Sequence, residues 1–281
     1  MSSGTDAPAV LRIAGASLRR GDRELWHGLD LEVQPGEMIA VIGPSGVGKT
    51  TLLRTILGLE SLSAGTIEVM GESVRGHGSR RVGYVPQHRS VPDDIAMRGR
   101  DLVALGVSGH RFGLPVPRRG DKARVDRLIR AVDATPFADQ PLGRLSGGEL
   151  QRLRIGQAIA DDPPLLLCDE PLTSLDLANQ QAVVRLIDRH RHEHNTAVLF
   201  VTHDINPVLE SVDRILYLAG KRFALGAPAE VLDTEVLSDL YGARVSVVRA
   251  GGRLVVLGAP GIDELEHDHC SDHEAEGGGF A

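Results

Sequence analysis

The chain has 281 residues, 42% hydrophobic and 25% charged, with a formal net charge of −7, a composition ordinary for a soluble protein of one large α/β domain or two modest ones. No apolar run approaches the ~18 residues of a membrane span, and no long basic run favours nucleic acid as a partner. The first residues lack the basic start and apolar core of a signal peptide, so we expect a cytoplasmic protein.

Strands and one glycine-rich loop dominate the first part of the chain. Leu29–Val33 alternates apolar with polar residues, as a half-buried strand does. The apolar run Met38–Ile42 precedes the glycine-rich stretch Gly43–Thr50, and residues 51–57 are apolar at helical spacing. This order predicts a strand, a loop and a helix that ends near Gly58. Two further strands are predicted: Thr66–Met70 and Arg81–Gln87.

Between about residue 88 and residue 160 the pattern becomes mainly helical. Three segments carry apolar residues at helical spacing: 101–106, 122–132 and 150–159. We expect a loop rich in Gly, Pro and Arg between Gly106 and Gly120.

Strand patterns return after residue 160. Pro164–Cys168 and Ala197–Val201 are continuous apolar runs, as in strands buried on both faces, and Gln180–His190 between them is helical. Ile215–Leu218 has the pattern of the last core strand. Because strands alternate with helices, we predict an α/β fold with a mostly parallel sheet covered by helices. Two alternating runs in residues 245–257 predict a β-hairpin.

The stretch Gly43–Thr50 has the pattern G-x-x-x-x-G-K-[ST] between a strand and a helix. Its glycines let the backbone wrap a phosphate, Lys49 is expected to reach the β- and γ-phosphates, and the Thr50 hydroxyl to bind Mg²⁺. An ordinary turn before a helix is the alternative, and the complete pattern disfavours it. The candidate nucleotide-binding residues here are Gly43, Pro44, Ser45, Gly46, Val47, Gly48, Lys49, Thr50 and Thr51.

Two more motifs suit phosphate chemistry. Asp169 and Glu170 end an apolar run, where Asp169 could hold Mg²⁺ and Glu170 could polarise the water that attacks the γ-phosphate; capping of the next turn is the alternative. Leu145–Gln151 starts a helix with two glycines, which exposes N–H groups to an anion, and it is equally a capping box. This loop is far along the chain from Gly43–Thr50, so a second copy could supply it to the phosphate.

Five motifs occur together over residues ~10–240 in the order found in an ABC-transporter ATP-binding subunit, which the chain therefore resembles: Gly43–Thr50, Leu145–Gln151, Asp169–Glu170, Ser174–Asp176 and Thr202–Asp204. The resemblance implies an ABC ATPase domain over residues 10–240, with a P-loop NTPase core, an antiparallel β subdomain and an inserted helical subdomain at about 88–160. Residues 241–260 would form a C-terminal β extension. ATP and Mg²⁺ would be the cofactors, in a head-to-tail homodimer that holds two ATP molecules.

The same resemblance assigns roles residue by residue. Ser146, Gly147 and Gly148 would act on the ATP bound by the partner copy. Gln87 would link Mg²⁺ and the γ-phosphate to the helical subdomain and a permease, with Thr50 and Asp169 as the other Mg²⁺ contacts. Asp176 would cross the dimer interface, or simply cap a helix. His203 would contact the γ-phosphate, although a lone His after a strand is more often structural.

One position departs from the family pattern. Where the family often stacks an aromatic residue on adenine, this chain has Arg20, whose guanidinium plane could stack on a base. We expect Trp26 to pack within the β subdomain instead.

Within the family, the chain resembles import subunits for divalent metals such as zinc or manganese. Tyr84–Gln87 followed by Val103–Gly106, and Leu240–Gly242 followed by Val245–Val248, carry this resemblance, and Ile95–Met97 only partly keeps the branch's pattern. This resemblance implies a separate transmembrane permease and a substrate-binding protein as partners. It also implies a peripheral place on the inner face of the cell membrane, through the permease.

The tail, residues 261–281, is acidic, bears histidines and is rich in glycine, so we expect it to be disordered. The His, Cys and carboxylate side chains of the tail suit Zn²⁺ binding. The alternative is a solvated acidic tail without a metal role. The candidate ligands are His267, His269, Cys270 and His273.

Other functions remain open at this point. An ABC ATPase for another substrate, an exporter subunit, or a soluble ABC ATPase that remodels protein or nucleic acid would share these motifs. The single P-loop and the lack of sustained heptads disfavour the soluble remodelling enzyme. A non-catalytic metal-binding regulator is disfavoured by the full motif set.

Overall fold

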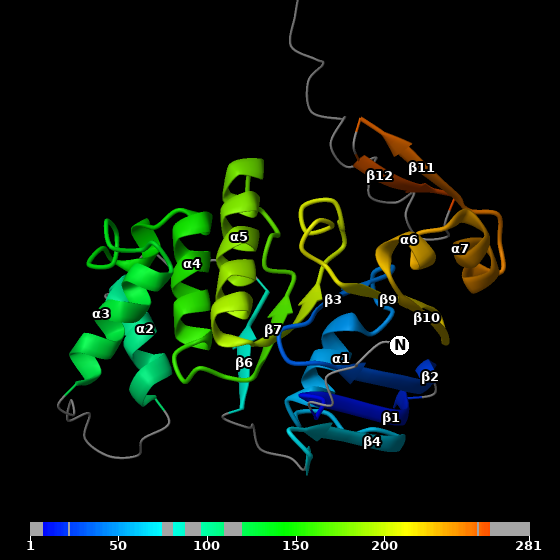
Figure 1. The fold of residues 1–281 in the computed structure, drawn as a ribbon, viewed down its shortest axis with the longest axis horizontal. Coiled ribbons are helices and arrows are strands. Elements are labelled where there is room, and N and C mark those ends of the chain that lie inside the picture. Colours follow the sequence, from blue (N-terminus) through cyan, green and yellow to red (C-terminus); the bar gives the residue numbers. More distant parts are fainter. Residues whose placement is uncertain are drawn as a thin grey trace, which may run out of the picture.

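The computed structural model describes residues 8–21, 23–74, 81–87, 97–109, 120–251 and 253–258. Its largest sheet has six strands in the order β10-β9-β3-β8-β7-β6 (Figure 1). All neighbouring pairs are parallel except β10 with β9. The strands of this sheet are β3 (Met38–Ile42), β6 (Val82–Val85), β7 (Leu165–Asp169), β8 (Ala197–Val201), β9 (Arg214–Ala219) and β10 (Arg222–Gly226).

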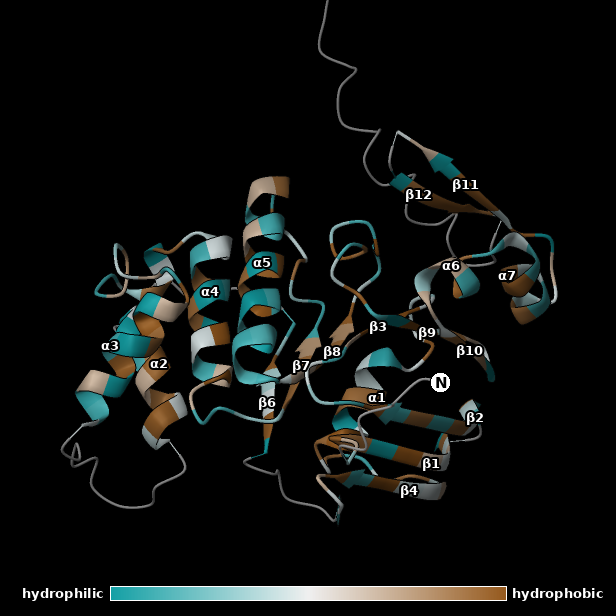
Figure 2. Cartoon of the chain, in the orientation of Figure 1, coloured by the Kyte–Doolittle hydropathy of each residue, from teal (hydrophilic) through white to brown (hydrophobic). Residues whose placement is uncertain are grey.

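The apolar runs form the buried centre of this sheet, as predicted. Every residue of β3, β7 and β8 is buried. Alternate residues of β3 face opposite sides: Met38 and Ala40 pack in one core cluster, and Ile39 and Val41 in the other. Figure 2 shows β7 and β8 as apolar strands beside the more polar helix α5 (Leu177–His194). The sheet is therefore a layer with a core on each face.

A second, antiparallel sheet covers one face, in the order β2-β1-β4-β5. Helix α1 (Lys49–Ile56) lies between the two sheets (Figure 1), and its Leu52 and Leu53 share a core cluster with Leu29 and Trp26. Trp26 thus packs against the antiparallel sheet as expected. The strands are β1 (Leu11–Arg20), β2 (Arg23–Val33), β4 (Ala64–Val69) and β5 (Glu72–Ser73).

Helices inserted between β6 and β7 form a group at one end of the molecule (Figure 1). They are α2 (Gly99–Ser108), α3 (Asp121–Ala131), the 3₁₀ helix Leu142–Arg144 and α4 (Gly147–Ala158). The expectation that a loop begins at Gly106 is wrong, because α2 continues to Ser108. A Cβ atom on Gly106 would lie 2.3 Å from the Gln157 carbonyl oxygen, so this glycine serves close packing of α2 on α4.

The C-terminal part holds elements that the sequence patterns missed. Ile215–Leu218 is not the last strand of the sheet, because β10 adds an antiparallel edge. The residues of β10 are half-buried or exposed, so they lack the apolar run that identified the central strands. Two helices follow, α6 (Pro228–Val231) and α7 (Thr234–Tyr241). The predicted hairpin is confirmed, with β11 (Ser246–Ala250) paired to β12 (Arg253–Leu257).

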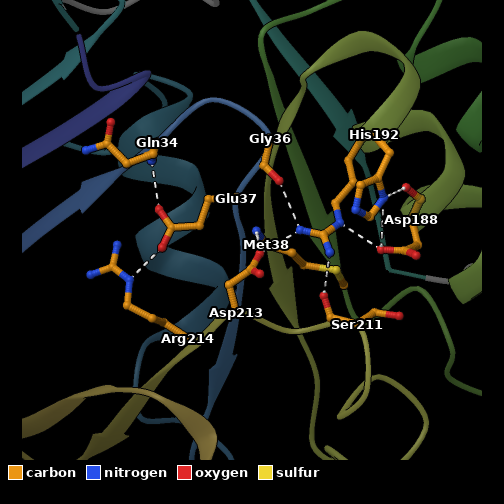
Figure 3. A network of polar contacts seen from close by, with 10 residues as sticks. Gln34, Gly36, Glu37, Met38, Asp188, His192, Ser211, Asp213 and Arg214 are labelled. Atoms are coloured by element: carbon orange, nitrogen blue, oxygen red, sulfur yellow. Dashed lines mark hydrogen bonds and ion pairs between the residues drawn. The ribbon is translucent and has the colours of Figure 1, made fainter. Parts of the chain in front are cut away.

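A polar network closes the amino end of the central strands (Figure 3). The buried Arg191 of α5 donates to the Gly36 carbonyl at 2.9 Å, the Asp213 carboxylate at 2.6 Å and the Ser211 carbonyl at 3.0 Å. Asp213 also accepts the Met38 N–H at 2.8 Å. These contacts fix the start of β3, and the functional side chains described next lie at its other end. None of the helices in the described ranges has the length and apolar composition of a membrane span.

Candidate active site

The site forms where neighbouring parallel strands end. The loop Gly43–Gly48 follows β3, Gln87 follows β6, Asp169 ends β7, and His203 follows β8. Parallel strands bring their carboxyl ends to one edge of the sheet, which is where ligands bind in open α/β sheets. Residues that are far apart in the sequence therefore share one site.

The phosphate loop needs glycine at two positions in particular. A Cβ atom on Gly43, which has φ +142°, would lie 2.1 Å from the Leu218 carbonyl oxygen. Gly48 has φ +104°, and a Cβ atom there would lie 3.1 Å from Trp26 Nε1. Trp26 therefore lies beneath the phosphate loop as well as in the antiparallel sheet. Among the described side chains, its buried Nε1 is one of the few without a hydrogen-bond partner.

Lys49 places a buried cation at the mouth of this loop. Its Nζ donates to the Gly43 carbonyl at 2.6 Å and to the Pro44 carbonyl at 3.0 Å. Burial lowers the pKa of Lys49, and the nearby carboxylates of Glu170 and Asp169 oppose that shift. Within the described residues this buried ammonium group hydrogen-bonds to carbonyl oxygens and forms no ion pair, which suits an anionic ligand. In the rest of the loop, Ser45 and Gly46 are exposed and Val47 is buried, and Thr51 is half-buried in the first turn of α1.

Thr50 and Asp169 meet at the end of β7. The Thr50 hydroxyl donates to Asp169 Oδ1 at 2.9 Å, and the Tyr84 hydroxyl donates to Asp169 Oδ2 at 3.2 Å. Burial raises the pKa of Asp169, which is 2% exposed, and these two hydrogen bonds partly offset the rise. Oxygen donors of this kind fit Mg²⁺, which usually takes few protein ligands and completes its shell with water and phosphate. The described residues contain no cluster of three or more His, Cys, Asp or Glu side chains suited to a metal.

Glu170 lies at the centre of a second group of polar side chains. Its Oε2 accepts from Gln87 Nε2 at 3.0 Å and from Thr173 Oγ1 at 3.3 Å, and it lies 4.0 Å from His203 Nδ1. The backbone of Glu170 is left-handed, with φ +46°, and its N–H donates to the Val201 carbonyl at 3.0 Å. Such a conformation costs ~1 kcal/mol or more and is typical of functional sites. The structure thus brings Gln87, Glu170 and His203 together.

Ser146 and Asp176 both cap helices in the structure. Ser146 Oγ accepts the Glu149 N–H at 3.3 Å at the start of α4. Asp176 accepts the N–H and the side-chain amide of Asn179, each at 2.8 Å, at the start of α5. The capping alternatives considered for both motifs are therefore confirmed as local structure. Capping leaves the remaining N–H groups at each helix start available to a ligand.

The two capped helix starts lie next to each other. A Cβ atom on Gly148 would lie 2.4 Å from Asn179 Oδ1, so glycine is required for α4 to approach α5. Among the described residues no hydrogen bond or ion pair joins Ser146, Gly147, Gly148 or Asp176 to the phosphate loop of the same chain. Their contact with a partner's ATP stays a prediction.

Two predicted sites are not joined to this centre. Arg20 is exposed at the end of β1, where its register partner is Arg23. Among the described residues no hydrogen bond or ion pair involves the Arg20 side chain, and its stacking on adenine stays a prediction. The tail residues lie outside the described ranges: His267, His269, Cys270 and His273.

Three side chains at the site were not among the predicted site residues: Tyr84, Thr173 and Asn179. The contact between Tyr84 and Asp169 depends on β6 lying beside β7, and an apolar pattern does not encode strand order. The sequence position of Thr173 could have identified it, because it follows Glu170 by three residues. Asn179 could also have been found, because it lies three residues beyond the capping residue Asp176.

Comparisons with known proteins agree with this geometry. Residues 26–173 match the family model described as ABC transporter. The chain is 32% identical over 265 residues to the zinc import ATP-binding protein ZnuC of Halorhodospira halophila, covering 94% of this chain and 90% of that protein. It is 33% identical to the ferric enterobactin transport ATP-binding protein FepC of Escherichia coli, covering 90% of this chain and 95% of that protein. Further relatives are named for manganese, hemin and sulfate.

A solved structure supports the same fold. It is described as an inward-facing, metal-chelate type ABC transporter, and its matching chain is 29% identical to this one. The TM-score is 0.74, with 88% of this chain and 96% of that chain covered.

Proposed function

Because this chain belongs to the ABC transporter family, we propose that it is the ATP-hydrolysing subunit of an importer for a divalent metal cation such as zinc or manganese. The observation that carries the hydrolytic part is the meeting of Lys49, Thr50, Asp169 and Glu170 at the ends of β3 and β7. The metal part is supported by the sequence resemblance to metal import subunits and by relatives that are named for zinc and manganese.

Each side chain has a distinct task in this proposal. Lys49 and the N–H groups of the phosphate loop bind the phosphates of ATP. Thr50 and Asp169 would hold Mg²⁺, which neutralises negative charge on the phosphate oxygens. Glu170 accepts a proton from the attacking water, with its carboxylate oriented by Gln87 and Thr173. His203 donates a hydrogen bond toward the terminal phosphate.

A complete site requires two copies of the chain in this proposal. Ser146 and Asp176 cap two helix starts that meet where Gly148 approaches Asn179, and among the described residues neither is bonded to the phosphate loop of its own chain. We therefore place them against the ATP of a partner copy in a head-to-tail homodimer. This arrangement makes closure of the dimer depend on ATP and its reopening depend on hydrolysis.

The surface beside Gln87 is where we place the permease. A groove of about 380 Å³ lies between β6, α2 and α4, with Pro86, Gly106 and Gln157 among its lining residues. Pro86 precedes Gln87, whose amide is bonded to Glu170 at 3.0 Å. Movement of a membrane partner at this groove would therefore be transmitted to the hydrolytic carboxylate. A substrate-binding protein would deliver the ion to the permease from the other side of the membrane.

The main alternative is an importer of another substrate, because relatives named for ferric enterobactin, hemin and sulfate have similar identities. The ATP site is common to all of them and does not select the ion. The transported substrate therefore has to be measured in cells.

The test compares total cellular zinc, manganese, iron and nickel in metal-limited cells that carry the wild-type chain, Lys49→Ala or Lys221→Ala. Lys221 is an exposed lysine paired with Glu24, so its variant controls for loss of a lysine outside the site. We expect a selective fall of zinc or manganese in Lys49→Ala alone. Unchanged zinc and manganese with a fall in iron would contradict the metal assignment and favour a siderophore or hemin importer.

A further inference from the structure

The C-terminal hairpin contacts the loop that carries His203. Asn206 Nδ2 donates to the Leu254 carbonyl at 3.0 Å, and Asn206 Oδ1 accepts the Leu254 N–H at 2.7 Å. One side-chain amide therefore pairs with both backbone groups of a β12 residue, much as a neighbouring strand would. Figure 1 shows β11 and β12 beside the loop between β8 and β9. We call this pair of hydrogen bonds the Asn206 clamp.

Asp204 connects the Asn206 clamp to His203. Its Oδ1 accepts the N–H of Asn206 at 2.9 Å and the side-chain amide of Asn206 at 2.8 Å. On the other side, Thr202 Oγ1 donates to the Asp204 carbonyl at 2.7 Å and accepts the Asp204 N–H at 3.2 Å. His203 thus lies between two residues of one hydrogen-bonded turn, and that turn is anchored to the hairpin.

The hairpin depends on such contacts for its own position. A two-stranded sheet is marginal by itself, and in the described part of the chain β11 and β12 pair with each other and with no third strand. On the β11 side, Thr234 Oγ1 of α7 accepts the Val247 N–H at 3.0 Å, and Ser238 Oγ bonds both backbone groups of Val245 at 3.1 Å. On the β12 side, Leu254 is buried and the Asn206 clamp supplies the polar contact. The hairpin therefore bridges α7 and the His203 loop.

A pocket of about 480 Å³ lies where the His203 loop, α5 and β12 come together, with Gln180, Asp204 and Arg253 among its lining residues. The loop is anchored below by Ile205 and Val208, which are buried. Beside this pocket, the Asn206 clamp supplies two hydrogen bonds between the loop and β12.

We propose that Asn206 is a positioning residue for ATP hydrolysis: by docking the C-terminal hairpin on the loop after β8, it holds His203 toward Glu170. This inference rests on the proposed role of His203. Misplacement of a catalytic group by a fraction of an ångström lowers the rate of the chemical step, whereas it leaves ATP binding at the phosphate loop unchanged. The hairpin thereby becomes a part of the molecule through which the hydrolytic rate can be set.

The test measures steady-state ATP hydrolysis by the full-length protein and its Asn206→Ala variant. We expect kcat to fall roughly three- to tenfold, the effect of two lost hydrogen bonds on loop placement, with KM for ATP within about twofold of wild type. The matched control is Val256→Ala, which trims a partly buried hairpin residue and leaves the Asn206 clamp intact. Val256→Ala should lower the midpoint of thermal unfolding by about as much as Asn206→Ala does, and it should leave kcat unchanged. Equal loss of kcat in both variants would overturn the proposal, since the hairpin would then matter only for stability.

A double-mutant cycle with His203→Ala tests whether Asn206→Ala lowers kcat through His203. Radiolabelled ATP is used to quantify the residual hydrolysis. We expect Asn206→Ala to cause no further fall in kcat when His203 is already absent. A fall of the same factor in both backgrounds would overturn the proposal. Should His203→Ala alone hydrolyse ATP at the wild-type rate, the proposed role of His203 would fail as well, which separates the two failures.

Discussion

Asp169 and Glu170 are adjacent residues with different environments. Asp169 is almost fully buried and accepts hydrogen bonds from Thr50 and Tyr84, whereas the Glu170 side chain is 21% exposed and accepts from Gln87. The turn at Glu170, with its left-handed backbone, points the two carboxylates to separate partners. In the proposed function these two environments suit two tasks, Mg²⁺ binding for Asp169 and activation of the attacking water for Glu170.

The pairing of Thr50 with Asp169 leads to a prediction about Mg²⁺. Thr50→Ala removes a hydroxyl ligand and leaves the buried Asp169 without one of its donors, so we expect hydrolysis to fall by roughly 100-fold or more and half-saturation to need more Mg²⁺. Thr50→Ser keeps the hydroxyl and is the control. The measurement is the ATPase rate as a function of Mg²⁺ concentration. The same half-saturation in Thr50→Ala and wild type would contradict the assignment of Thr50 as a ligand.

Much of the residue-level site was predictable, because the phosphate loop, Asp169–Glu170 and His203 each follow an apolar run in the sequence. Their meeting follows from parallel strands that end at one edge. Contacts that depend on strand order or on helix packing were not predictable. The Tyr84 hydroxyl on Asp169 and the Asn206 amide on Leu254 are examples, since they join segments 85 and 48 residues apart.

At the scale of elements, α5 contains a buried histidine that opposes stability in acid. His190 is 7% exposed and its ring stacks on His194, with 4.5 Å between ring centroids. Burial, reinforced by His194 and opposed by Asp162, lowers the pKa of His190 from 6.5 to about 4. Between these two values the unfolded chain binds a proton that the folded chain does not, so stability falls as pH falls.

This shift predicts the pH dependence of unfolding. Because of His190, the free energy of unfolding should fall by about 2 kcal/mol between pH 7 and pH 5. We expect His190→Leu to flatten the dependence of the urea midpoint on pH in this range, compared with wild type. Parallel curves for His190→Leu and wild type would show that His190 does not titrate in this way.

Helices and strands were predicted correctly where one face, or both faces, of the element are buried. The apolar runs of β3, β7 and β8 are visible in the sequence because those strands are buried on both faces. In contrast, β10 is an edge strand of half-buried residues, and α6 has four residues, too few for a helical period. Gly106 was misread as a helix end, because glycine within a helix is used here for close packing against α4.

At the scale of the molecule, the proposed function makes the site of one chain half of what hydrolysis needs. The phosphate loop and Glu170 lie at the strand ends, and the capped starts of α4 and α5 present N–H groups elsewhere on the same chain. The order of motifs indicates the family, and no pattern within one sequence indicates which surface meets a second copy. The central claim is therefore that ATP joins two chains.

The most direct measurement of this claim is the molar mass of Glu170→Gln in solution with ATP and Mg²⁺, by size-exclusion chromatography with light scattering. In the proposed function this variant binds ATP without hydrolysing it, so we expect a stable dimer that disappears without ATP. The double variant Lys49→Ala with Glu170→Gln should stay monomeric, since it lacks the ammonium group that binds phosphate. A Glu170→Gln protein that binds ATP and remains a monomer would contradict the shared site.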